Sequence, residues 1–377
     1  MPLTPDELEP LLRLALVQGI GPQRLSMLVG TFGDARGVFR ASEAKLGTIP
    51  GIGSELMGRI RAADLPKARS ETRKALTQLE RRGAFAITPD DPAYPKAFRT
   101  VTEPPYLVFG VGDLGALERP GLAVVGTRSP TRYGRIAAER LSFDLAMAGL
   151  VVVSGLARGI DSAAHRGALD AQGTTIAVLG HGIDLIYPSE NRELFARIRD
   201  RGLLLTEYPP GETPKAGNFP RRNRLIAALA EAVLVVEMGH KSGAQHTVGF
   251  ALEQGREVLA VPGPILSPTS AGTNQLIKDG ARLIASAEDV LEELRGVGWS
   301  ALRSRSPPPA AHRLDPALPL LSHTEGALLE ILSTDPLHVD DLARDTGISA
   351  ADALTTLLHL ELQGLVTSLP GKHYCRT

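Results

Sequence analysis

The chain of 377 residues is 43% hydrophobic and 22% charged, and its formal net charge is −1. This length exceeds one ordinary core and predicts two or three domains, and the composition is that of a globular protein rather than a disordered one. A net charge near zero excludes a uniformly basic nucleic-acid binder, so any such site must be a local basic patch.

The single cysteine, Cys375, excludes internal disulfides and a cysteine-based zinc cluster. No apolar run approaches the roughly 18 residues of a membrane-spanning helix. The polar, acidic N-terminal segment also lacks the features of a signal peptide. We therefore expect a cytoplasmic protein with no membrane association.

Residues 1–83 are predicted to form a small helical, SAM-like domain, in which glycine-bounded turns at 19–25 and 49–60 connect helices. The second turn has the helix-hairpin-helix pattern, whose backbone amides approach a DNA phosphate at a helix start. This segment holds 13 lysines and arginines against 9 acidic residues. Two interpretations stay open: contact with double-stranded DNA, and purely structural helix–helix turns.

Residues 84–295 are predicted to form a Rossmann-like domain with a proline-rich connector over 84–118, in which a long helix cannot form. A short strand is expected at 106–112. Further on, apolar runs such as 122–126 and 150–155 alternate with segments of helical period, the pattern of a parallel sheet covered on both faces. Such doubly wound sheets bind ligands at the carboxyl ends of their strands, where the strand order reverses.

Small and basic residues follow the predicted strands at this edge: Gly126, Thr127 and Arg128; Ser154 and Gly155; Ser242 and Gly243. The sequence FPRRNR at 219–224 places three arginines and an asparagine ahead of an apolar helix, on the loop that leads into it. The planar guanidinium group suits phosphate oxygens and stacks on bases. We expect a phosphate-binding cleft without catalytic residues.

Catalytic and cofactor motifs are weak. No dinucleotide fingerprint or P-loop occurs, and Ser154 and Gly155 stand where an acidic residue would hold a ribose. Asp161 and His165 have the spacing of a metal pair but no third ligand, so His165 is interpreted as a helix-packing residue. No obvious base accompanies Cys375. We predict no metal, no cofactor and no nucleophile.

A linker is predicted over 296–319, with Trp299 as an anchor against a neighbouring domain, and a winged-helix domain over 320–377. A capping box at Ser322 and Glu325 opens the latter. Residues 322–377 hold 3 basic and 8 acidic residues, and the expected recognition helix at 350–365 has no lysine or arginine. Since base edges are read by basic or amide side chains, we interpret this domain as a protein-interaction module.

Six motifs occur together in order: VVGTRSPTRYG, VVVSGLARGIDSAAHRGAL, GHGIDLIYPSEN, FPRRNRLIAALA, SGAQHT and VPGP followed by SAGTNQLIKDGA. Over about residues 85–290 this set closely resembles the DNA-processing protein A family (DprA or Smf) of natural transformation. The resemblance implies a homodimer that binds single-stranded DNA, protects it and loads the recombinase RecA onto it, without catalysis.

The resemblance also assigns residues. The family's pocket arginine falls on Arg128, and its F-P-x-R-N-R motif falls on Phe219, Arg221, Arg222 and Arg224. Lys215 belongs to a loop of variable length, and Ser189 stands where the family often has a basic residue, so the nearest base there is Arg192. The predicted DNA contacts are Gly126, Thr127, Arg128, Ser154, Gly155, Arg192, Lys215, Phe219, Arg221, Arg222, Asn223, Arg224, Ser242 and Gly243.

Three alternatives remain. One of Arg222 and Arg224 forms a buried ion pair with Glu207 or Glu237 instead of binding DNA. A nucleoside-monophosphate phosphoribohydrolase has a related sheet, although the segment at 242–253 lacks that family's paired glycines and adjacent acid. A transcription regulator would bind duplex DNA through residues 320–377, which the acidic balance argues against.

Overall fold

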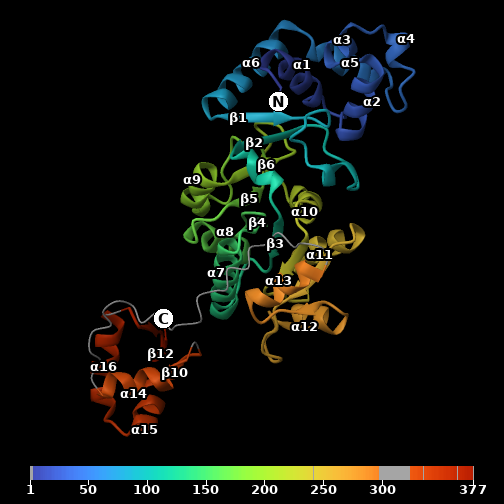
Figure 1. The fold of residues 1–377 in the computed structure, drawn as a ribbon. Helices are drawn as coiled ribbons and strands as arrows, with labels where there is room; N and C mark the ends of the chain where they lie inside the picture. The colour runs from blue at the N-terminus through green and yellow to red at the C-terminus, as the bar shows by residue number, and fades with distance from the viewer. Residues whose placement is uncertain (1–2, 241, 297–322, 334, 363, 377) are drawn as a thin grey trace. The chain divides into compact units, whose positions relative to one another are not determined.

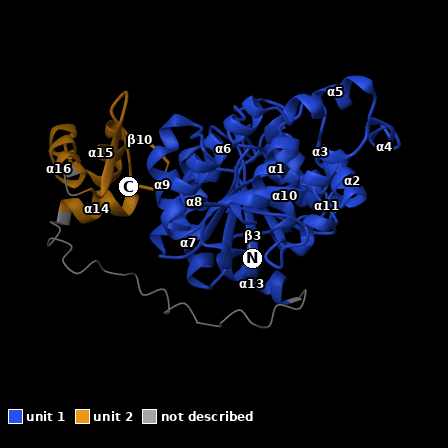
Figure 2. Ribbon diagram, turned by 90° about the horizontal axis from the view of Figure 1, so that it is seen from above, with its two compact units in different colours: residues 1–303 blue, residues 304–377 orange. Residues whose placement is uncertain are grey.

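The computed structural model describes residues 3–240, 242–296, 323–333, 335–362 and 364–376. They belong to two compact units, residues 1–303 and residues 304–377 (Figure 2). The predicted linker at 296–319, with Trp299, lies outside the described residues except for Gly296. Ser322, the expected N-cap, lies outside them as well.

The first unit opens with short helices around a leucine-rich core that includes Leu12, Leu28 and Ile60. Local capping fixes several helix starts; for example, Asp34 accepts a hydrogen bond from the backbone amide of Gly37 at 2.6 Å. The helices are α1 (Pro5–Ala15), α2 (Pro22–Phe32), α3 (Ala35–Arg40), α4 (Glu43–Leu46), α5 (Ser54–Ala63) and α6 (Pro66–Arg81).

A nine-stranded sheet forms the centre of this unit, with the strand order β1-β2-β6-β5-β4-β3-β7-β8-β9 (Figure 1). Its strands are β1 (Ala84–Ile87), β2 (Val108–Gly112), β3 (Gly121–Val125), β4 (Val151–Ser154), β5 (Thr175–Val178), β6 (Leu203–Thr206), β7 (Ala232–Val235), β8 (Glu257–Ala260) and β9 (Arg282–Leu283). The seven strands from β6 to β9 in that order pair in parallel.

The sheet differs from the predicted parallel sheet at one edge. The connector supplies β1 and β2, which pair with each other and with β6 in antiparallel orientation. The connector also contains two short 3-10 helices, η1 (Lys96–Arg99) and η2 (Leu114–Glu118). The prolines exclude a long helix, as predicted, and leave short extended segments that complete the sheet edge.

Helices cover both faces of the sheet, as the apolar strands predict. One core joins Leu122 and Val124 of β3 to α7 (Arg132–Met147), α8 (Ile160–Asp170) and α13 (Ala287–Gly296). The opposite core joins Ala123 and Val125 to α10 (Asn218–Ala228) and α11 (Ala244–Glu253). The remaining elements are the 3-10 helix η3 (Ser189–Asn191), α9 (Arg192–Arg201) and α12 (Ala271–Lys278).

The second unit is a winged helix with its own core, which includes Leu328, Leu342 and Leu357. It consists of α14 (His323–Ile331), β10 (Leu337–His338), α15 (Val339–Thr346), α16 (Ala350–Leu362), β11 (Val366–Leu369) and β12 (His373–Arg376). The expected two-stranded wing is present as β11 and β12, and β10 adds a third strand on the other side of β12.

In neither unit do the described residues include a helix with the length and apolarity needed to cross a membrane.

We expect Gly167→Ala to destabilise the first unit, because a Cβ at this position would lie 2.1 Å from the backbone oxygen of Glu139 on α7. Such overpacking costs about 1–3 kcal/mol. Gly58→Ala, inside α5 with nothing within 4 Å of the added Cβ, is the matched control and should be neutral or slightly stabilising. Urea unfolding of both variants tests this; equal stabilities would contradict the close α7–α8 packing.

Candidate nucleic-acid interface

The strand order reverses at β3, which leads through α7 to β4 on one side and pairs with β7 on the other. A pocket of about 450 Å³ lies at the carboxyl ends of these strands, where a doubly wound sheet binds its ligand. The predicted residues that line it are Gly126, Thr127, Arg128, Phe219, Arg222, Asn223, Ser242 and Gly243.

The loop after β3 is fixed against the loop after β7. The Thr127 amide donates to the backbone oxygen of Glu237 at 2.8 Å, and a Cβ at Gly126 would lie 2.8 Å from that same oxygen. The Glu237 carboxylate accepts the amide and hydroxyl of Thr131 at the start of α7. Glu237 therefore holds loops together, while the neighbouring Arg128 side chain stays exposed at the pocket.

The arginine-rich segment lies on α10, which begins at Asn218, one residue before Phe219. The prediction that it occupies a loop ahead of a helix is therefore wrong, because the helix begins about two turns earlier than predicted. Pro220 is compatible with the first turn because the first amides of a helix have no intrahelical acceptor. The helical arrangement sends the arginines in different directions.

Arg222 is buried beneath the strand ends. Its guanidinium donates to the backbone oxygen of Gly155, at 2.9 Å, and to that of Val178. Burial lowers the pKa of Arg222 to about 10, and the nearby Asp161 carboxylate opposes that shift. A Cβ at Gly155 would lie 2.5 Å from this guanidinium, which explains the glycine there. Arg222 thus lines the base of the pocket and joins β4 to β5.

Arg224 forms the buried ion pair that the sequence left open. Its guanidinium contacts both Glu207 carboxylate oxygens, at 2.5 and 2.8 Å, and the two side chains are 3% and 4% exposed. Backbone oxygens of Thr102, Glu103 and Arg221 accept its other N–H groups. All five donors of Arg224 are therefore used inside the protein. Arg224 therefore has no free N–H group with which to make the predicted contact with DNA.

Other predicted contacts lie outside the pocket. Arg221 is exposed and pairs with Glu103 at 3.1 Å, and Lys215 is exposed and pairs with Glu212 at 2.7 Å. Arg192 is exposed at the start of α9. Ser154 is buried, and its hydroxyl donates to the Val124 backbone oxygen. The structure thus brings together only the part of the predicted set that surrounds Arg128.

A row of aromatic rings runs from the pocket. The Arg128 guanidinium carbon lies 5.4 Å from the ring centroid of Phe219, within cation–π range. The Phe219 centroid is 5.6 Å from that of Tyr187, which is 6.2 Å from that of His181. A Cβ at Gly180 would lie 2.9 Å from the Phe219 ring, so glycine permits this approach. We call the side chains of Phe219, Tyr187 and His181 the aromatic row.

The sequence analysis missed Tyr187 and assigned no role to His181. Both belong to the motif GHGIDLIYPSEN directly after β5, so position at a strand end was the available signal. Tyr187 is 45% exposed, which leaves its ring accessible.

The Asp161–His165 pair is structural, as interpreted from the sequence. His165 is fully buried, its Nδ1 lies 2.7 Å from the Thr175 hydroxyl, and burial lowers its pKa to about 3. Asp161 accepts the amides of Gly155 and Ala157. Burial raises the pKa of Asp161, and Arg222 opposes the rise. Among the described residues no group of three or more metal-ligand side chains occurs.

The two predicted turns of the helical domain lie next to each other. Gly19 and Gly51 both have positive φ, at 98° and 80°. Arg24 donates to the Gly19 oxygen at 2.6 Å, and its guanidinium lies 3.1 Å from the Cβ position of Gly51. Arg24 therefore joins the turns, and contact with duplex DNA stays a prediction.

These features define a doubly wound α/β protein whose switch-point pocket has an accessible arginine beside a row of aromatic rings, in a chain that also contains a winged helix. Residues 85–295 match the family model for DNA recombination-mediator protein A, and residues 307–372 match that for the DprA winged helix domain. The chain belongs to the DNA recombination-mediator protein A (DprA/Smf) family.

Individual proteins of this family are similar to the chain in sequence and in structure. The chain is 34% identical to protein Smf of Synechocystis over 96% of both chains. Its structure is similar to the X-ray structure of Streptococcus pneumoniae DNA processing protein A, with a TM-score of 0.60 and 35% identity. The match covers 78% of this chain and 99% of the S. pneumoniae chain. It also resembles Helicobacter pylori DNA processing protein A, described with a unique single-stranded DNA binding mode (TM-score 0.52, 32% identity, 56% and 96% coverage).

We expect Arg224→Ala to destabilise the protein by about 3–5 kcal/mol, because it leaves the buried Glu207 carboxylate unpaired. Arg221→Ala is the matched control on the same helix. Its ion pair with Glu103 is exposed, so the loss should stay below about 1 kcal/mol. Urea unfolding measures both. Similar, small losses would show that the Arg224–Glu207 pair contributes little.

Proposed function

We propose that this chain is a non-catalytic single-stranded DNA-binding recombination mediator. It binds incoming DNA at the switch-point pocket, protects it and loads RecA onto it during natural transformation, acting as a homodimer in the cytoplasm. Membership of the recombination-mediator family supports the DNA-processing role. The single-stranded DNA binding described for the H. pylori relative supports the ligand.

The observation that carries the proposal is the aromatic row beside the exposed Arg128. Proteins that bind single strands combine cationic groups for the backbone with aromatic faces for the bases. Arg128 is the accessible pocket arginine, whereas Arg222 and Arg224 are engaged in the interior. Phe219 and Tyr187 offer neighbouring ring faces on which unpaired bases stack.

The start of α11 supports the same ligand. Ser242 and Gly243 line the pocket immediately before α11, so the positive end of the helix dipole lies at the pocket. This partial positive charge favours a phosphate. The phosphate therefore has the Arg128 cation on the β3 side and the positive end of α11 on the β7 side.

Arg128→Ala is expected to weaken binding of single strands of every sequence and to lower the logarithmic salt slope by about 0.7, the value of one phosphate contact. Gel shifts at several salt concentrations, with single- and double-stranded oligonucleotides, measure this. Arg192→Ala and Lys215→Ala, outside the pocket, are matched charge controls and should change binding less. Unchanged binding by Arg128→Ala removes this residue from the site.

Phe219→Leu tests the stacking term, since it keeps an apolar side chain on α10 and removes the ring. We expect a loss of affinity corresponding to about 1–3 kcal/mol with an unchanged salt slope, because base stacking involves no counterion release. Fluorescence anisotropy over a salt series separates the two terms. A change in slope without a loss of stacking affinity would contradict the assignment.

The remaining parts of the proposal have direct tests. Stimulation of RecA filament formation on coated single strands tests loading, and sedimentation at several concentrations tests the dimer. Release of adenine from adenosine monophosphate would support the phosphoribohydrolase alternative and overturn the non-catalytic assignment.

A further inference from the structure

The positive charge of the helical domain is concentrated on α6. Residues 1–83 carry 13 basic and 9 acidic residues, a surplus of four, and Pro66–Arg81 carry 5 basic and 2 acidic residues, a surplus of three. The glycine turns therefore account for little of the surplus. The basic residues of α6 are Lys67, Arg69, Arg73, Lys74 and Arg81.

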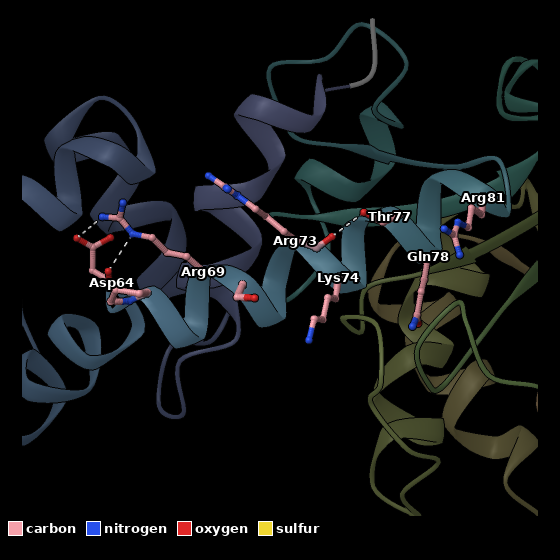
Figure 3. Close-up of a pocket in the computed structure, with 9 residues that line it drawn as sticks. Asp64, Arg69, Arg73, Lys74, Thr77, Gln78 and Arg81 are labelled. Carbon is pink, nitrogen blue, oxygen red and sulfur yellow. Dashed lines mark hydrogen bonds and ion pairs between the residues drawn. The ribbon is translucent and has the colours of Figure 1, made fainter.

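An open trough of about 800 Å³ runs along this helix (Figure 3). We call it the α6 trough; it is lined by Asp64, Pro66, Arg69, Ser70, Arg73, Lys74, Thr77, Gln78 and Arg81. Lys74 and Gln78 extend from one edge of the helix in Figure 3, and Arg73 extends from the other. At 3.6 residues per turn the two acidic residues, Glu71 and Glu80, fall at the edges of the stripe of donors.

Most of these cations have no protein partner. Arg69 pairs with Asp64 at 2.9 Å. Arg73, Lys74 and Arg81 form no ion pair with any residue that the structure describes. Their exposed side chains are thus available to an anionic ligand.

The end of α6 contacts a loop beside the switch-point site. Arg82, directly after the helix, donates to the backbone oxygen of Asp184 at 2.5 Å. Asp184 lies in the loop that follows β5, between His181 and Tyr187 of the aromatic row. The Arg81 end of the α6 trough therefore lies near the loop that carries His181 and Tyr187.

The chemistry of the trough favours a nucleic-acid backbone over a protein. None of the exposed large hydrophobic residues of the described chain lies within Pro66–Arg81, whereas protein interfaces have an apolar core. Lys67, Lys74 and Arg81 recur every seven residues, or about 10.5 Å along the axis. The Ser70 hydroxyl and the Gln78 side-chain amide lie between them. These groups can follow a chain of phosphates.

We propose that the α6 trough is a second contact surface for the same single-stranded DNA, which engages its backbone beyond the switch-point pocket. This inference rests on the proposed function. It predicts that the trough contributes to binding of long strands and not to binding of strands that only fill the pocket. The glycine turns are not part of this surface.

The test compares Lys74→Ala/Arg81→Ala in the full chain with the parent protein on oligonucleotides of roughly 8 and roughly 40 nucleotides. On the short strand, affinity should be unchanged. On the long strand, binding should weaken several-fold, and the salt slope should fall by about 1.4, for two contacts at about 0.7 each. Lys45→Ala/Lys278→Ala removes the same charge from exposed positions elsewhere and should change neither.

The outcomes separate the two proposals. If the parent protein binds neither oligonucleotide, the proposed function fails. If it binds both and the α6 variant matches it on the long strand, only the α6 inference is overturned. A loss confined to duplex DNA, or an equal loss in the lysine control, also overturns it, because the trough would then be a duplex site or a general charge effect.

Discussion

The buried Arg222 guanidinium is the interaction on which the site geometry depends. It contacts backbone oxygens at the ends of β4 and β5 and lies beside Asp161 of α8. Because a desolvated cation is costly unless it is hydrogen-bonded and paired, these contacts fix the start of α10 against the sheet edge. Phe219 and Asn223, on either side of Arg222 in that helix, are thereby placed at the pocket.

Helical geometry directs the three arginines of the FPRRNR segment into different environments. Arg221 stays exposed, Arg222 turns under the strand ends and Arg224 turns into the pair with Glu207. A cluster of like charges is thus mostly structural in this protein. The exposed cation at the pocket, Arg128, comes instead from the end of β3, and its contact with the Phe219 ring links the two segments.

The sequence predicted the sheet, its helical layers and the winged helix, because continuous apolar strands bounded by glycine have few other arrangements. It also predicted a ligand site at the carboxyl ends of the strands. It could not predict the antiparallel edge, because β1 and β2 are too short to show a period. It could not predict which of Arg221, Arg222 and Arg224 are buried and which is exposed, because the direction of each side chain depends on whether the segment is loop or helix. The predicted domain boundaries and DNA contacts remain predictions.

Two glycines are explained only by the folded structure of the site. Gly155 leaves room for Arg222, and Gly180 leaves room for the Phe219 ring. In the sequence they are small residues at strand ends. In the structure each is packed against a side chain more than 35 residues away. The close packing beneath the pocket leaves the stacking faces and Arg128 on a rigid base. If the proposed function is correct, this packing reduces the binding free energy that is lost in ordering the protein.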